Sequence, residues 1–221
     1  MGRLMYFDAM RAFAIFLVIY AHILYMGYNN WSISPFHSFF INFYMQLFFF
    51  ISGFFMYKEQ TYRAGEIIDV LKKRFVQLII PTIVFGFLYA YVTNRGVDDM
   101  LFIDSKSGYW YTYVLFIFIS LYMLFSGIKW NIRLICMIVV AISVYGLSIY
   151  VQHHYNSDRL ISLLSIQRWW YILYFVEGMI VKRYYHLFEK HMESKVLSSI
   201  LVILFYRICC HFNISSADNV C

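Results

Sequence analysis

Residues 36–57 read FHSFFINFYMQLFFFISGFFMY, a run of 22 positions without a single Asp, Glu, Lys or Arg. A helix needs roughly 20 predominantly apolar residues to cross the hydrocarbon core of a bilayer. The run does not alternate between polar and apolar residues, as the strand of a membrane barrel would. We therefore predict that these residues form a membrane-spanning helix.

Six further runs of similar character occur along the chain. Together the predicted spans are residues 9–27, 36–57, 75–93, 109–126, 132–151, 166–181 and 196–212. Apolar residues make up 62% of the chain and charged residues 14%, against roughly 45–50% and 25% in a soluble domain. A soluble fold of this size has nowhere to bury so many large apolar side chains. This excludes a soluble enzyme, a disordered chain and a collagen-like fibre.

Basic residues gather in the loops on one side of the predicted bundle. The loops on this side contain Lys58, Arg63, Lys72, Lys73, Arg74, Lys129, Lys182, Arg183, Lys190 and Lys195. The positive-inside rule places these loops and the N-terminus in the cytoplasm. The predicted fold class is thus an all-α polytopic membrane protein with about seven transmembrane helices. The basic clusters set orientation, so the net charge of +6 calls for no acidic partner, and we expect no nucleic-acid partner.

The first predicted span carries three ionisable residues, Asp8, Arg11 and His22. Ionisable groups within a span usually face a cavity or a partner, so they are candidates for function. Asp8 and Arg11 are three positions apart and can pair on a helix surface. Arg11 and His22 are eleven positions apart, which places them on one face, roughly 16 Å apart along the axis. The alternatives are an orientation anchor for Arg11 and a packing role for His22.

Residues 6–22, YFDAMRAFAIFLVIYAH, resemble the opening of the acyltransferase-3 family of membrane-bound O-acyltransferases, which begins with Asp-x-x-Arg and an Arg-x10-His pair. Residues 47–55, LFFFISGFF, are similar to the family's second-helix signature. Residues 72–81, KKRFVQLIIP, resemble the entry to its third helix, although Gln77 stands where a second arginine is common. Weaker similarities are the aromatic run at 109–111 and the sequence FVEG at 175–178.

The resemblance implies transfer of an acyl group, commonly acetyl, from cytoplasmic acyl-coenzyme A to a hydroxyl group of a cell-envelope glycan or lipid-linked sugar. It implies an integral protein of the bacterial inner membrane, with acyl-coenzyme A as donor substrate and no bound cofactor. His22 is then the general base, because an imidazole titrates near neutral pH. Arg11 binds the donor or positions its thioester, because guanidinium binds phosphate in a bidentate fork.

Supporting roles in substrate binding are assigned on the same grounds. Asp8 orients Arg11, and Arg74 and Lys73 add positive charge where the donor enters, unless they only anchor the helix. Trp110 lines an acceptor channel or belongs to an interfacial aromatic belt. Glu177 is a carboxylate within a span, and its role is open between substrate contact and helix packing. For Ser52, beside Gly53, we favour close helix packing over nucleophilic work.

The domain interpretation assigns residues 1–195 to an acyltransferase-like transmembrane domain and 196–221 to a last helix and divergent tail. Family members usually have about ten helices, so we expect a C-terminally truncated copy. The alternatives to an active enzyme are a glycan transport or flippase-like protein and an inactive truncated acyltransferase. The four cysteines lack the spacing of a metal site, and we predict no metal.

Overall fold

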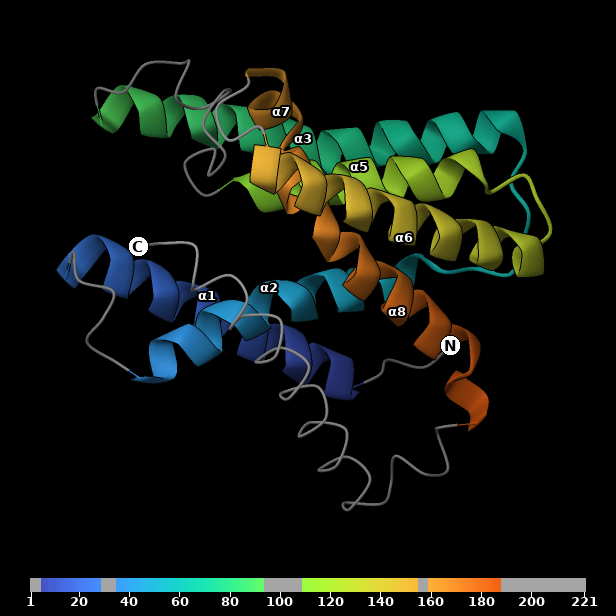
Figure 1. Ribbon diagram of the computed structural model, residues 1–221, viewed down its shortest axis with the longest axis horizontal. Coiled ribbons are helices and arrows are strands. Elements are labelled where there is room, and N and C mark those ends of the chain that lie inside the picture. Colours follow the sequence, from blue (N-terminus) through green and yellow to red (C-terminus); the bar gives the residue numbers. More distant parts are fainter. Residues whose placement is uncertain (1–4, 29–34, 94–108, 155–158, 188–221) are drawn as a thin grey trace.

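The computed structural model describes residues 5–28, 35–93, 109–154 and 159–187. Every regular element in these ranges is a helix, as Figure 1 shows. The elements are α1 (Met5–Tyr28), α2 (Pro35–Met56), α3 (Ala64–Thr93), α5 (Trp110–Leu124), α6 (Trp130–His154), α7 (Arg159–Leu164), the 3₁₀ helix η3 (Ile166–Tyr171) and α8 (Ile172–Arg183). The predicted all-α class is confirmed for this part of the chain.

Two of the described helices are long and apolar enough to cross a membrane, namely Ala64–Val92 of α3 and Trp130–His154 of α6. Phe43–Met56 and Trp110–Leu124 are shorter apolar segments. The last predicted span, 196–212, lies outside the described residues. The count of seven spans and the cytoplasmic N-terminus therefore stay predictions.

Large apolar side chains are exposed along the outer surfaces of the helices. On α3 they include Phe85, Phe87 and Leu88, each about half exposed, and Tyr91, which is 85% exposed. A water-soluble protein rarely exposes so continuous an apolar surface. The pattern is typical of helices that face lipid, and it supports the membrane interpretation of the composition.

Two elements differ from their predicted ranges. α3 begins at Ala64 rather than at 75, so that the basic residues 72–74 lie within the helix. The predicted span 166–181 is divided into η3 and α8. η3 begins directly after Ser165, whose φ of 52° is left-handed, and the indole N–H of Trp169 donates to the carbonyl of Leu164 at the end of α7. These contacts hold residues 166–171 in tight 3₁₀ turns, which an apolar sequence pattern does not reveal.

The core lies around α8, which packs against α2 and α6, while α1 packs on α2 and α3 on α5 (Figure 1). α2 and α8 approach most closely at two glycines. A Cβ atom added to Gly53 would overlap the carbonyl group of Phe175, and one added to Gly178 would overlap the carbonyl of Phe50. The close packing predicted beside Ser52 is confirmed at Gly53, because only glycine lets the two backbones come this near.

The segment between α2 and α3, the segment between α5 and α6 and the end of α8 meet at one end of the bundle. We call this end the basic end. There the backbone N–H of Tyr62, between α2 and α3, donates to the carbonyl of Ser126, between α5 and α6. Arg183, at the end of α8, donates to the side chain of Asn131 at the start of α6. Of the basic residues predicted to share one side of the membrane, Lys58, Arg63, Lys129, Lys182 and Arg183 lie in or beside these segments.

Candidate active site

Asp8 and Arg11 begin the site on the first two turns of α1. The Arg11 guanidinium lies 4.0 Å from the Asp8 carboxylate, and their side chains are 44% and 37% exposed. The pairing predicted from their three-residue spacing is confirmed. An ion pair this exposed contributes little to stability, so its main effect is to restrict the orientation of the guanidinium.

The same guanidinium also lies against an aromatic ring in the last turn of α2. The Arg11 Cζ atom is 4.4 Å from the ring centroid of Phe55, a distance at which a cation is attracted to the π-face. One turn earlier on α1, the ring of Phe7 packs against Phe54 and Phe55. α1 is thus seated on residues 54–55 of the run 47–55, so two segments that the sequence singled out separately form one contact surface.

His22 lies on the same continuous helix, near its far end. Its side chain is exposed, and Nδ1 is 2.8 Å from the carbonyl oxygen of Val18. Because a carbonyl oxygen only accepts, this contact is a hydrogen bond when the proton is on Nδ1, and Nε2 is then the acceptor nitrogen. A histidine in this tautomer can take a proton from a hydroxyl group through Nε2.

α2 meets α5 through a pair of hydroxyl groups. Ser52 Oγ lies 3.3 Å from the Tyr111 hydroxyl oxygen, and the Tyr111 ring packs against Phe48 and Phe49. The assignment of Ser52 to packing alone missed this polar contact, since no spacing in the sequence links residue 52 to residue 111.

Trp110 lies in an aromatic cluster at the opposite end from the basic loops. Its ring is 5.3 Å from that of Tyr171 and 6.3 Å from that of Phe49, and the Arg168 Cζ atom lies 5.0 Å from its ring centroid. A partly exposed indole beside an arginine can stack on a sugar ring, and it can equally anchor a helix at an interface. The structure therefore leaves both predicted roles of Trp110 possible.

The remaining predicted residues lie apart from Arg11 and His22. Arg74 donates to the side chain of Gln77 at 3.2 Å, so the glutamine at the second arginine position accepts from the first. Lys73 and Glu177 are exposed on α3 and α8. In the described part of the chain, no hydrogen bond or ion pair joins Lys73, Arg74 or Glu177 to Arg11 or His22.

Arg133 is a buried charged residue that the sequence interpretation missed. It is fully buried in α6, and its guanidinium donates to the carbonyl oxygens of Lys58, Gln60, Ser126 and Ile128 and to the Tyr122 hydroxyl, at 2.7–3.0 Å. The sequence signal that could have identified it is a single arginine one residue into the apolar run 132–151. Its contacts give it a structural role, because it ties the two loops of the basic end together.

A family model described as an acyltransferase domain matches residues 4–218, nearly the whole chain. The chain belongs to the acyltransferase-3 family. The resemblance carried by residues 6–22, 47–55 and 72–81 is thereby confirmed, and this acyltransferase has the apolar helices of a membrane protein. No curated protein and no solved structure matches the chain.

The described residues of this acyltransferase contain no group of three or more His, Cys, Asp or Glu side chains that could hold a metal ion. Cys136, in α6, is a free thiol. The candidate groups for chemistry that the described fold presents near the first two motifs are the Asp8–Arg11 pair, the His22 imidazole and the Ser52–Tyr111 hydroxyl pair.

Proposed function

We propose that this acyltransferase moves an acyl group, commonly acetyl, from acyl-coenzyme A in the cytoplasm to a hydroxyl group of a cell-envelope glycan or lipid-linked sugar. It would act in the inner membrane of a bacterium. The observation that carries the proposal is the seating of Arg11, from the family's first motif, on Phe55 of its second-helix signature. Two motifs of an acyltransferase family thus share one surface that presents a cation.

In the proposed reaction, Arg11 holds the donor from the cytoplasmic side, either at a phosphate or at the thioester carbonyl. His22 Nε2 takes the proton of the acceptor hydroxyl, and the oxygen attacks the thioester carbonyl. The C–S bond breaks, and the coenzyme A thiolate takes the proton back from the imidazolium. The roughly 16 Å between the two residues along α1 suits a donor whose long pantetheine arm lies along the helix.

The proposal is tested with purified protein in sealed vesicles, using acetyl-coenzyme A labelled in the acetyl group and a crude envelope glycan. Supplied on the cytoplasmic face, the donor should release coenzyme A and leave an alkali-labile label on the glycan in equal amounts. Supplied only on the other face, it should give neither product. Coenzyme A release without label on the glycan, or no release in either orientation, would contradict the proposed transfer.

A further inference from the structure

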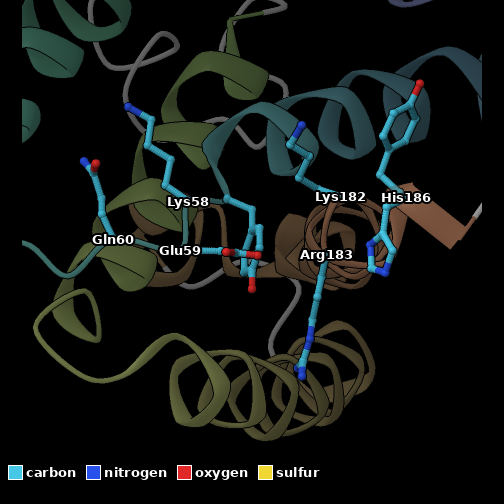
Figure 2. Close-up of a pocket in the computed structure, with 8 residues that line it drawn as sticks. Lys58, Glu59, Gln60, Lys182, Arg183 and His186 are labelled. Carbon is cyan, nitrogen blue, oxygen red and sulfur yellow. The ribbon is translucent and has the colours of Figure 1, made fainter. Parts of the chain in front are cut away.

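A pocket of about 440 Å³ lies at the basic end, between the segment that follows α2 and the end of α8. Tyr57 belongs to its lining. Figure 2 shows Lys58 and Glu59 on one side of the pocket and Lys182, Arg183 and His186 on the other. None of these residues belongs to the candidate active site described above. The two walls are more than 120 positions apart in the sequence.

Tyr57 lines the pocket and carries the first notable group, a hydroxyl whose oxygen is buried. The residue is only 4% exposed, and within the described fold its hydroxyl oxygen has no hydrogen-bond partner. A phenol is protonated at neutral pH and can donate. A buried donor without a partner costs about 1–3 kcal/mol, which a ligand that accepts its hydrogen bond would recover.

The charge of the pocket is positive. Three cations, Lys58, Lys182 and Arg183, and a single carboxylate, Glu59, line it, and in Figure 2 the cationic side chains extend in different directions. Both α2 and α8 end here, and the negative ends of their dipoles favour cations over anions. Attraction for an anion must therefore come from the side chains, and it should depend strongly on each of them.

The walls of the pocket are held in place before any ligand arrives. Arg133 donates to the backbone carbonyls of Lys58 and Gln60, both at 3.0 Å, which fixes the segment after α2 from behind. Arg183 donates to the Asn131 side chain at 2.9 Å and lies over the ring of Trp130. A preorganised site spends less free energy on ordering its side chains when it binds.

The pocket also adjoins the Arg11 surface. The Lys182 Nζ atom is 4.7 Å from the ring centroid of Phe54, and Phe54 packs against Phe55 at 5.4 Å. Lys182 therefore lies over one ring, and Arg11 over the other, of two aromatic residues that pack against each other.

We infer that this pocket binds a phosphate group, which accepts from the Tyr57 hydroxyl and is held by Lys58, Lys182 and Arg183. Phosphate suits a site lined by several cations and one neutral donor, because its oxygens accept several charge-assisted hydrogen bonds at once. The phosphate could come from a soluble donor substrate, in which case the inference rests on the proposed function, or from a phospholipid headgroup, in which case it does not.

The test measures binding to the full chain in nanodiscs, so that its failure is distinct from a failure of acyl transfer. In one arm, inorganic pyrophosphate is titrated calorimetrically into protein in neutral phosphatidylcholine discs. In the other, retention of phosphatidylglycerol from mixed discs is followed by native mass spectrometry. Saturable pyrophosphate binding identifies a soluble source, selective lipid retention identifies a headgroup, and the absence of both would overturn the inference.

Charge variants locate the ligand. Lys58→Gln and Lys182→Gln should each weaken binding by about tenfold, the equivalent of one charge-assisted hydrogen bond. Glu59→Gln should strengthen it, because a like charge is removed. Lys72→Gln, an equal change of charge on an exposed residue of α3 that does not line the pocket, is the matched control. Pocket variants that behave like this control would overturn the inference.

Tyr57→Phe separates a ligand-binding role from a structural one. Because the hydroxyl has no protein partner in the described fold, its removal should leave thermal stability unchanged or slightly raised. Phosphate binding should nevertheless weaken severalfold. Unchanged binding by a stable Tyr57→Phe protein would contradict the placement of the phosphate at this hydroxyl.

Discussion

A methyl group added at the α2–α8 crossing should separate two helices that the site depends on. In Gly53→Ala, the new Cβ would overlap the backbone carbonyl of Phe175, and a backbone group cannot turn aside as a flexible side chain would. Overpacking of this kind costs about 1–3 kcal/mol, and an overlap with backbone belongs at the upper end. The better helix propensity of alanine returns about 1 kcal/mol. We expect a net loss of about 2 kcal/mol in the free energy of unfolding.

Gly146→Ala is the matched control, because the same substitution in α6 meets no atom within 4 Å. It gains the helix propensity alone and should be more stable than the parent by up to about 1 kcal/mol. Unfolding of both variants in detergent micelles, followed by tryptophan fluorescence, should therefore separate them by about 3 kcal/mol. Equal stabilities would refute the argument that α2 and α8 are in backbone contact at this glycine.

Three further predictions concern the arginines and the topology. Arg133→Met should lower the free energy of unfolding by at least about 3 kcal/mol, because several buried carbonyl groups lose their donor; a thermal unfolding temperature like that of the parent would contradict this. Arg11→Lys should strongly impair coenzyme A release at unchanged membrane abundance, since the charge survives and the bidentate fork does not; activity equal to the parent would remove Arg11 from the mechanism. Single cysteines placed at positions 63 and 190 should resist a membrane-impermeant reagent in intact cells and one at 98 should react; the reverse pattern would invert the topology.

Local features of the site were predictable from the sequence because they depend on residues within a few turns of each other. The Asp8–Arg11 pair follows from a three-residue spacing on one helix, and the structure has it. The helical character of residues 36–57 follows from a long apolar run, and α2 occupies nearly the same range. The need for a small residue at Gly53 was also foreseen, although not its partner on α8.

Features that depend on distant segments were not predictable from one sequence. The Ser52–Tyr111 contact joins residues 59 positions apart, and the carbonyl oxygens around Arg133 come from two separate loops. Hydropathy could not show the turn at Ser165, because the residues after it stay apolar whether they form one helix or two. In the first two cases the deciding contact is a polar group meeting a backbone or side chain far along the chain.

The central claim is that this acyltransferase uses His22 as its general base, and His22→Ala tests it most directly. The matched control is His153→Ala, which removes an exposed histidine from the last turn of α6. With acetyl-coenzyme A and an envelope-glycan acceptor, we predict that His22→Ala lowers the rate of coenzyme A release by about 10²–10⁴-fold, the usual contribution of a general base. His153→Ala should match the parent, and all three proteins should be equally abundant in the membrane. Undiminished turnover by His22→Ala would contradict the account.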